Sequence, residues 1–503
     1  MFKKILIANR GEIALRVIRA CREMGIATVA VYSEADRGSR HVQQADEARF
    51  LGPPPPLESY LNIEAILSAA GKSGAEAIHP GYGFLAENAL FARRCEESGI
   101  AFIGPDSKAL ALVGDKVASR RTAASIQVPL VPGMMAASRS MREFEEAVES
   151  IGYPVLVKAS GGGGGKGMHI VRSTKELHSA VETSRREARS AFGDDSVYLE
   201  KYIERPRHVE FQILADHHGN VVHLFERECS IQRRYQKILE ETPSVALDND
   251  LRRRMGRTAV AIMKATHYTN AGTVEFLLDQ DRNFYFLEVN ARIQVEHPVT
   301  ELVLGVDLVK QQIRIACGEK LPFRQEDLAQ RGHAIECRIY AENPEQDFLP
   351  GPGRIILARE PEGPGIRCDS GIYSGIEVSS FYDPILSKLI VWSEDRETAR
   401  RRMIAALNDY TILGIPTTIG FLADVLDHPE FAAGRTHTHF INQHLPNWKP
   451  RGSDSVLLDI ALVASALSGS KHSGARQGAR QLESPTPWQT TGKWEIGGSR
   501  HGL

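Results

Sequence analysis

A run of five glycines is the feature that most constrains this chain: residues 161–165 are all glycine, and Lys166 and Gly167 follow. Strand-like segments lie on both sides of the run, PVLVKA at 154–159 and MHIVR at 168–172. Successive glycines let backbone N–H groups close on phosphate oxygens without Cβ clashes. A plain flexible surface loop is the alternative, and Lys158 and Lys166 beside the run favour phosphate binding over it.

Two common nucleotide-binding motifs do not fit this loop. A Walker A loop requires glycine at Ser160 and serine or threonine at Gly167. Gly162, Gly164 and Gly167 form GxGxxG, but that fingerprint opens a helix, whereas a strand-like MHIV follows here. The strand–loop–strand pattern therefore predicts a flap. Because ordering so many glycines costs conformational entropy, we expect the flap to be a mobile lid until nucleotide binds.

The rest of the chain predicts a mixed fold, α/β and α+β. Residues 1–115 alternate apolar strands with a helix at 12–24, which predicts a parallel, Rossmann-like N-terminal domain. Its expected strands lie at 5–8, 28–32, 75–79 and 102–104. Residues 130–205 are expected to form a small unit that carries the glycine flap.

From residue 197 onward the pattern predicts a mostly antiparallel sheet, and we assign the C-terminal domain to 206–447. The expected strands lie at 197–203, 209–216, 221–226, 273–278, 284–290 and 381–392, with a helix at 397–406. Residues 448–503 differ in character: a helix is expected over 456–467 and a Gly/Ser-rich basic linker over 468–480.

Composition excludes several classes of protein. The 503 residues suggest two to four domains, and a net charge of -2 gives no reason to expect nucleic acid or an anionic membrane as partner. Six scattered cysteines without CxxC spacing argue against zinc and favour a reducing compartment. Residues 1–12 fit a buried strand better than a signal peptide, and no apolar run is long enough to span a membrane. We expect a cytoplasmic protein.

Two acidic residues lie inside apolar strands, Glu275 in TVEFLL and Glu288 in FYFLEVN. The intervening DQDRN predicts a hairpin that places these strands side by side. At the period of two that a strand shows, one face of the second strand and its continuation carries Glu288, Asn290, Arg292, Gln294 and Glu296. A solvated edge is the alternative to an active-site floor. Carboxylates and an amide are hard oxygen ligands that suit Mg²⁺.

Taken together, these features resemble the ATP-grasp fold, and the chain is similar to biotin carboxylases across nearly its first 445 residues. The motifs that carry the resemblance occur in order: IANRGEIA, HPGYGFLAEN, FIGP, GDK, KASGGGGGKGM, EKYIERPRHVEFQ, RECSIQRR, NARIQVEHPVTE and GHAIECRIYAE. The resemblance implies an enzyme that uses ATP, Mg²⁺ (or Mn²⁺) and bicarbonate to carboxylate biotin presented on a carrier.

The resemblance also implies a role for each matching residue. The nucleotide would be held by Lys116, Lys158, Gly163, Gly164, Gly165, Glu200, Lys201, Ile203, His208 and Gln232, and the metal by Glu275, Glu288 and Asn290. Lys237 would lie by the γ-phosphate. Bicarbonate would contact Arg292, Gln294 and Val295, with Glu296 as its base, while Tyr82 and Arg338 would face biotin. For His208 the alternative is an ordinary strand histidine, and for Arg338 an ion pair with Glu336 or Glu342.

These roles agree with the chemistry of the groups. Bicarbonate is a poor nucleophile until it loses its proton, so a carboxylate must lie within hydrogen-bond reach. An arginine fork matches a planar oxyanion. Attack on the γ-phosphate would give carboxyphosphate, which yields CO₂ and phosphate. The phosphate would deprotonate the biotin ureido nitrogen, and Arg338 would stabilise the resulting enolate.

Two features of the chain need comment beside the resemblance: a tyrosine at a position where the family often has histidine, and the lack of a biotin-carrying motif. Tyr235 in IQRRYQK stands where the family often has histidine, so the hydroxyl is kept and the imidazole geometry is lost. Biotin is carried on the lysine of an AMKM-type motif, and the 503 residues contain none; Met263–Lys264 in IMKAT does not qualify. We therefore expect the partners to be a separate biotin carboxyl carrier protein, carboxyltransferase subunits and a second copy of the chain.

Residues 454–503 resemble the start of the middle domain of acyl-CoA carboxylase α subunits, as expected of a split subunit or a truncation. The final acceptor stays open among acetyl-, propionyl- and methylcrotonyl-CoA and pyruvate. Two other functions are weighed against biotin carboxylation: a carbamoyl-phosphate synthetase-like ligase and a nucleotide-sensing subunit. The HPGYGFLAEN and RIQVEHPVTE blocks argue against the first. Intact Lys237, Arg292, Glu296 and Arg338 argue against the second.

Overall fold

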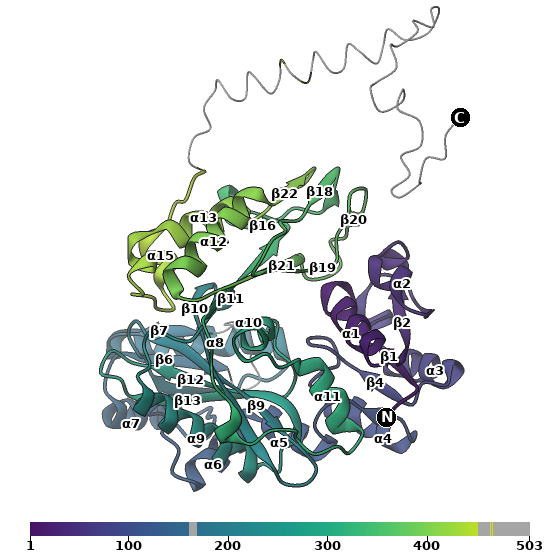
Figure 1. The fold of residues 1–503 in the computed structure, drawn as a ribbon. Coiled ribbons are helices and arrows are strands. Elements are labelled where there is room, and N and C mark those ends of the chain that lie inside the picture. The colour runs from purple at the N-terminus through teal and green to yellow at the C-terminus, as the bar shows by residue number, and fades with distance from the viewer. Residues whose placement is uncertain (160–167, 451–462, 464, 466–503) are drawn as a thin grey trace, which may run out of the picture. The chain divides into compact units, whose positions relative to one another are not determined.

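A computed structural model describes residues 1–159, 168–450, 463 and 465 (Figure 1). The glycine flap lies outside the described residues, as does most of the segment for which we expected a helix and a linker. The chain divides into two units, Met1–Lys449 and Pro450–Leu503, and the elements below belong to the first. The division of this unit into three domains stays a prediction.

The N-terminal region is a parallel sheet, as predicted, with the strand order β3-β2-β1-β4-β5. Its strands are β1 (Lys4–Ile7), β2 (Ala27–Ser33), β3 (Glu47–Gly52), β4 (Ala77–His79) and β5 (Ala101–Phe102). Helices α1 (Gly11–Glu23), α2 (Arg40–Gln44), α3 (Ile63–Ser73) and α4 (Ala89–Glu97) connect them. Strand β3 was not predicted, because EARFLG alternates exposed and partly buried residues at the sheet edge and has no apolar run.

A three-stranded sheet in the order β7-β6-β8 carries the glycine flap between two of its strands. Strands β6 (Val155–Ala159) and β7 (His169–Val171) are antiparallel neighbours, and β8 (Val197–Lys201) pairs with the other edge of β6. Helices α7 (Met141–Ile151) and α8 (Thr174–Phe192) contribute Phe144 and Leu177 to the core beneath this sheet. Helices α5 (Ser107–Gly114) and α6 (Lys116–Ser125) precede it. The predicted strand–loop–strand arrangement is therefore confirmed for the two flanking strands.

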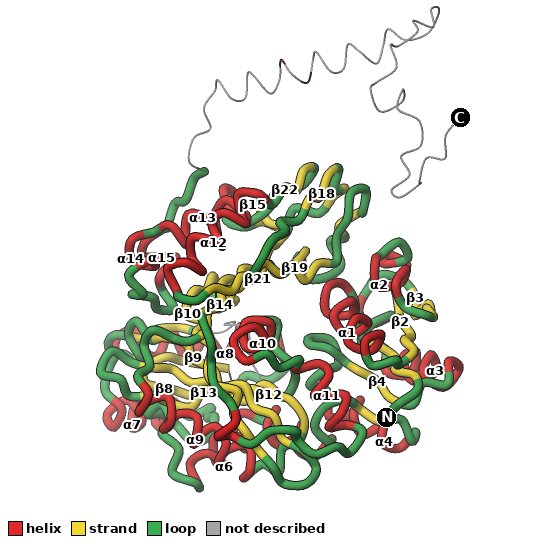
Figure 2. The backbone as a smooth tube through the Cα atoms, in the orientation of Figure 1, coloured by secondary structure: helices red, strands yellow, loops and turns green. Residues whose placement is uncertain are grey.

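An eight-stranded antiparallel sheet follows, in the order β13-β12-β9-β10-β11-β14-β21-β19 (Figure 2). Its strands are β9 (Arg207–Ala215), β10 (Val221–Arg233), β11 (Gln236–Thr242), β12 (Asn270–Leu278), β13 (Phe284–Asn290), β14 (His333–Tyr340), β19 (Ile366–Ser370) and β21 (Ile385–Ser393). Helix α9 (Asn249–Ala265) packs on β9 and β10, and α10 (His297–Leu304) and α11 (Leu308–Ala316) follow β13. The mostly antiparallel C-terminal sheet is as predicted.

The C-terminal part of this unit has a core of its own. Helices α12 (Arg396–Asp409), α13 (Ile419–Asp427), α14 (Pro429–Ala432) and α15 (Phe440–His444) pack against β14 and β21 through residues such as Met403 and Phe421. Short pairs complete it: β15 (Glu342–Asn343) with β16 (Leu349–Pro350), β17 (Gly353–Arg354) with β20 (Glu377–Val378), and β18 (Leu357–Arg359) with β22 (Thr411–Leu413).

Two predictions about the large sheet were wrong. Strand β10 does not end at residue 226 but continues to Arg233, and β11 was not predicted, because this part of the sheet buries charged residues in place of apolar ones. The strand that carries Glu288 ends at Asn290, and Glu296 is the N-cap of α10. The predicted continuous polar face from Glu288 to Glu296 is therefore wrong.

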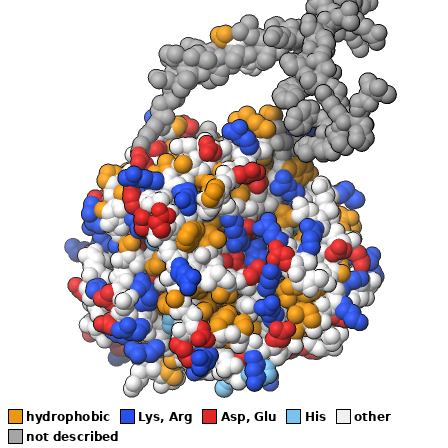
Figure 3. Space-filling model, in the orientation of Figure 1, with side chains coloured by type: hydrophobic (Ala, Val, Ile, Leu, Met, Phe, Trp, Pro, Cys, Tyr) orange, Lys and Arg blue, Asp and Glu red, His pale blue; other side chains and the backbone are white. Residues whose placement is uncertain are grey.

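On the face drawn in Figure 3, acidic and basic side chains are interspersed, as expected for a chain with a net charge of -2. Among the residues that the structure describes, no helix combines the length and the apolar character needed to cross a membrane.

The core between α9 and the large sheet leads to a stability prediction. Phe276 on β12 is 0% exposed and packs edge-on against Phe211 and Phe284. Phe276→Ala should lower the free energy of unfolding by about 3–5 kcal/mol, because it leaves a cavity as well as removing apolar contacts. Urea denaturation measures this. Leu57→Ala is the control, since Leu57 is 78% exposed and its loss should change stability by less than about 0.5 kcal/mol. Equal effects of the two changes would contradict the assigned core.

Candidate active site

A cavity of about 430 Å³ lies where residues of the three-stranded and the eight-stranded sheets face each other. Most of the predicted site residues line it: Lys116, Lys158, Glu200, Lys201, Ile203, His208, Gln232, Lys237, Glu275, Glu288, Asn290, Arg292, Gln294, Val295 and Arg338. Gly163, Gly164 and Gly165 lie outside the described residues. Glu296 and Tyr82 are not among the lining residues.

One end of the cavity is built around Glu200 on β8. Lys158 Nζ lies 2.7 Å from Glu200 Oε2, and Arg120 also pairs with this carboxylate. Although burial raises the pKa of Glu200, these two cations hold it below its ordinary value. Burial lowers the pKa of Lys158, but Glu200 and its other neighbours raise it above its ordinary value. Lys158 is therefore a charged group on β6, the strand that precedes the glycine flap, where it can face an anionic ligand.

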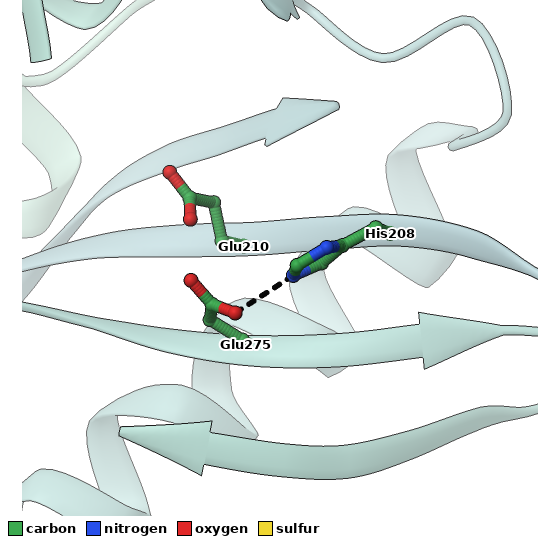
Figure 4. Close-up of side chains that lie close together, drawn as sticks. All are labelled: His208, Glu210 and Glu275. Atoms are coloured by element: carbon green, nitrogen blue, oxygen red, sulfur yellow. Dashed lines mark hydrogen bonds and ion pairs between the residues drawn. The ribbon is translucent and has the colours of Figure 1, made fainter. Parts of the chain in front are cut away.

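His208 on β9 connects the middle of the cavity to its carboxylates. Its Nε2 lies 2.8 Å from Glu275 Oε2, and its Nδ1 lies 2.6 Å from Gln232 Nε2. Figure 4 shows His208 and Glu210 on one strand and Glu275 on the next, with the three side chains close together. His208 is thus held on both ring nitrogens, and its imidazole orientation is set by the sheet.

Lys237 on β11 lies at the centre of three buried carboxylates. Its Nζ is 2.5 Å from Glu210, 2.8 Å from Glu275 and 2.8 Å from Glu296. Burial raises the pKa of Glu275 and of Glu296, but Lys237 together with His208 at Glu275 and with Arg338 at Glu296 outweighs it, and both pKa values lie well below the ordinary range. For Glu210, burial and the neighbouring carboxylates prevail over Arg227 and Lys237, so its pKa is raised.

The pair Glu275 and Glu288 fits a divalent cation. The two residues are directly opposed in the β12–β13 ladder, as the hairpin predicted, and Asn290 Nδ2 donates to Glu275 Oε1 at 2.6 Å. Burial and the Glu275 charge raise the pKa of Glu288, with Lys116 opposing them. A Mg²⁺ ion would relieve this repulsion and find hard oxygen ligands. His208, Glu210 and Glu275 also lie close enough to hold a metal, but Lys237 already supplies the positive charge there.

The turn between β13 and α10 presents an arginine to the cavity. Arg292 Nε lies 3.0 Å from Glu87, and its NH1 donates to Gln294 Oε1 at 2.9 Å. Gln294 in turn donates to Thr273 Oγ1 at 2.8 Å. These bonds fix the guanidinium fork at the cavity wall next to Val295, in a geometry that suits a small planar anion.

Glu296 is fully buried and bridges two cations. Its Oε1 accepts from Lys237, and its Oε2 accepts from Arg338 NH2 at 3.0 Å. Arg338 Nε also donates to Glu240 at 2.6 Å. The ion pair that we weighed for Arg338 with Glu336 or Glu342 is therefore not the one present, and Glu342 pairs with Arg233 at 2.8 Å.

Comparison with known proteins supplies the family. Family models match residues 1–110 (biotin carboxylase, N-terminal domain), 115–324 (carbamoyl-phosphate synthase L chain, ATP binding domain) and 336–443 (biotin carboxylase C-terminal domain). A biotin carboxylase of Nostoc sp. is 55% identical over 442 residues, which cover 88% of this chain and 99% of the relative. The chain belongs to the biotin carboxylase family. As a member it is an ATP-dependent carboxylase, and its ATP-grasp fold is confirmed.

Two further relatives belong to two different carboxylases. The methylcrotonoyl-CoA carboxylase α subunit of Dictyostelium discoideum is 48% identical over 498 residues, which cover 98% of this chain and 70% of the relative. The structure of the Hydrogenobacter thermophilus 2-oxoglutarate carboxylase biotin carboxylase domain dimer, with MgADP, ADP and bicarbonate, has a TM-score of 0.87 and 49% identity. It covers 90% of this chain and 100% of that domain.

The sequence analysis missed several charged residues around the cavity, among them Glu210, Glu240 and Lys388. Glu210, Glu240 and Lys388 all lie inside strands, as Glu275 does, and a charge in an apolar strand was the signal that found Glu275. Tyr82 donates its hydroxyl to Glu12 and lies beside the cavity. Tyr235, at the turn between β10 and β11, lines the cavity and is 49% exposed, so it can contact a nucleotide with its hydroxyl or its ring.

The carboxylates around Lys237 predict a pH-dependent stability effect. Lys237→Met should lower the free energy of unfolding by about 3–5 kcal/mol at pH 7, because it leaves buried carboxylates without their cation. The lowered pKa values of Glu275 and Glu296 stabilise the fold above the ordinary carboxyl pKa and lose that effect as pH falls. The difference between wild type and variant should therefore shrink below about pH 4.

Urea denaturation at several pH values measures this difference. Arg253→Met is the control, since Arg253 and Asp250 form an exposed pair with side-chain exposures of 65% and 82%. Its effect should stay below about 1 kcal/mol at every pH. A Lys237→Met penalty that did not depend on pH would show that the lysine does not act through these carboxylates.

Proposed function

We propose that this chain carboxylates the biotin of a separate carrier protein, using bicarbonate and MgATP, through carboxyphosphate. The observation that carries the proposal is the set of contacts that joins Lys237, Glu296 and Arg338 next to Arg292. Lys237, Arg292 and Arg338 line one cavity, and Glu296 lies behind it in contact with two of them, which supports a base for bicarbonate, a fork for its oxygens and a cation for phosphate.

In the proposed reaction Glu296 accepts the bicarbonate proton. Without ligand, Lys237 and Arg338 hold the pKa of Glu296 low, after burial has raised it. A γ-phosphate competes with Glu296 for Lys237. This weakens the hold of the lysine on Glu296, so the pKa of Glu296 rises and the carboxylate becomes a stronger base when ATP is in place.

Nucleotide binding is assigned to the wall formed by β6, β8 and β9. Lys116 and Lys158 would contact phosphates, with Gly163, Gly164 and Gly165 of the flap closing over them. Glu200, Lys201 and Ile203 would hold the adenine, and His208 and Gln232 the ribose. Glu275, Glu288 and Asn290 would hold Mg²⁺, which neutralises phosphate charge during transfer. The contact between His208 and Gln232 supports their joint assignment.

Once the bicarbonate oxygen bonds to the γ-phosphorus and ADP leaves, carboxyphosphate breaks down to CO₂ and phosphate. The phosphate removes the proton of the biotin ureido nitrogen, which then attacks CO₂. Arg338 would stabilise the biotin enolate, because its guanidinium lies at the cavity between Glu240 and Glu296. Tyr82 would face biotin from the other side.

The carrier, the final acceptor and the assembly are proposed from the sequence and from the relatives. The 503 residues contain no AMKM motif, so biotin would come from a carrier outside them. The Dictyostelium relative aligns over 98% of the chain, which extends the likeness into residues 450–503 and favours an acyl-CoA system over the keto acid of the Hydrogenobacter enzyme. A homodimer, as in that structure, and carboxyltransferase subunits complete the proposal.

Glu296→Gln tests the reaction most directly. Wild type should release phosphate from ATP only with bicarbonate, and faster with biotin. The variant should lose about 10²–10⁴-fold of this turnover, the range for a positioned base. Its KM for ATP should stay close to that of wild type, because Glu296 does not line the nucleotide wall. Bicarbonate-dependent turnover in wild type that biotin did not accelerate would instead favour a carbamoyl-phosphate synthetase-like ligase, and near-normal turnover in the variant would overturn the role of Glu296.

The carrier assignment makes a separate prediction. A biotinylated carrier domain should be carboxylated far better than free biotin, because docking gives a tethered biotin an effective concentration in the millimolar range, about 1 mM or more. After co-expression with a biotin ligase, the intact mass of this chain should show no added biotin. A biotinyl mass on the chain, or equal rates with free and carrier-bound biotin at equal concentration, would contradict a separate carrier.

A further inference from the structure

Lys388 on β21 is a fully buried lysine at the edge of the active site. Its ladder neighbours are Arg338 on β14 and Asp369 on β19. It does not line the cavity, yet its ammonium group contacts both Val295, which does, and Glu12 on α1. Its contacts therefore indicate what it does.

The first contact is with the turn between β13 and α10. Lys388 Nζ donates to the carbonyl oxygen of Val295 at 2.8 Å. Residues 291–295 belong to no helix or strand, and side chains hold this turn: Glu87 accepts from the Ala291 N–H at 2.9 Å, and Gln294 donates to Thr273. Lys388 fixes the turn at Val295, the residue between Gln294 and Glu296.

The second contact is with Glu12 on α1. Lys388 Nζ lies 3.2 Å from Glu12 Oε2, and Glu12 Oε1 accepts the hydroxyl hydrogen of Tyr82. The ammonium group is also 5.9 Å from the centre of the Tyr82 ring. Glu12 is 3% exposed, so the pair is desolvated and its geometry is fixed by its neighbours. Lys388 thus reaches, through one carboxylate, the tyrosine that we assign to biotin.

Stability alone gives no reason to bury this ion pair. Replacing a buried ion pair by apolar residues of similar volume is often neutral or stabilising, because two charges must be desolvated to form the pair. Two residues further along β21, the side chain of Ile390 is also fully buried, so this strand accepts an apolar residue in its interior. What an apolar residue cannot do is bond the Val295 carbonyl and orient Glu12 at the same time.

We propose that Lys388 is a positioning residue that fixes the bicarbonate-binding turn at Val295 and, through Glu12, the hydroxyl of Tyr82. This inference rests on the proposed function, since it assigns a role within that reaction. Lys388 places the turn so that the Val295 backbone and the Arg292 fork meet the same anion. By holding Glu12 it also keeps Tyr82 in one orientation for the second substrate.

Lys388→Met tests the inference, because methionine keeps the length of the side chain and removes its charge. The KM for bicarbonate should rise about 10- to 100-fold, the range expected when a hydrogen bond to a charged group is lost. The KM for ATP should stay within about twofold, because Lys388 contacts no residue that we assign to the nucleotide. Lys388→Arg, which keeps a cationic donor, should recover most of the affinity for bicarbonate.

Two further variants separate positioning from stability. Glu12→Gln combined with Lys388→Met avoids a buried carboxylate without its partner and should fold where the single variant does not, with the same rise in KM for bicarbonate. Arg396→Met is the matched control: Arg396 forms a buried pair with Glu241 at 2.7 Å, away from the cavity lining. It should lower the thermal midpoint and leave the KM for bicarbonate unchanged.

Three outcomes would contradict the positioning role of Lys388. A KM for bicarbonate within about twofold of wild type in a folded Lys388→Met or double variant would overturn the inference while leaving the proposed function intact. The same rise in Arg396→Met as in Lys388→Met would show a general loss of stability and would also overturn it. If wild type itself turned over ATP without bicarbonate, the proposed function and this inference would fail together.

Discussion

The contact between Lys237 and the three carboxylates of Glu210, Glu275 and Glu296 is the interaction on which the site depends. Each carboxylate comes from a different element: β9, β12 and the start of α10. Without a central cation, three buried like charges would force these elements apart or keep the carboxyl groups protonated. The lysine therefore makes the junction of the large sheet stable and keeps Glu275 and Glu296 ionised at the same time.

The same principle extends along the sheet. Arg227 is fully buried and bonds Glu210 at 2.5 Å, and Arg338 pairs with Glu240 and Glu296. Cations and carboxylates alternate along this row of contacts, so that every cation of the row shares a carboxylate with another cation. A row of this kind is a poor way to gain stability, because desolvation offsets the attraction. It is a good way to hold several ionised groups at fixed positions in a site that must bind anions and move a proton.

Sequence patterns predict the strands and helices that bury apolar side chains. They do not predict the strands that bury charged side chains. The hairpin that opposes Glu275 to Glu288 was predicted correctly, because DQDRN is a clear turn between two apolar strands. The extension of β10 through RECSIQRR and the whole of β11 were missed, since their charged residues look solvated until their partners on β9 and β14 are known. Glu240 and Lys388 were missed for the same reason. Lys237 and Arg338 were identified by resemblance to a family, because periodicity gives no sign that they share Glu296.

The end of β13 shows why an irregular turn is useful at this point. Had the strand continued, as its alternation suggested, Glu288 and Glu296 would have been about 26 Å apart, at about 3.3 Å for each of eight residues. Ending the strand at Asn290 and starting α10 at His297 folds the chain back, so that Glu296 reaches Lys237 while Glu288 faces Lys116. In the proposed reaction one short sequence block can then serve two tasks, because its first carboxylate, Glu288, is assigned to the metal and its last, Glu296, to bicarbonate. Because such a turn has no ladder to hold it, its geometry depends on side chains from other elements, which is why charged residues as distant in sequence as Glu87 and Lys388 converge on residues 291–295.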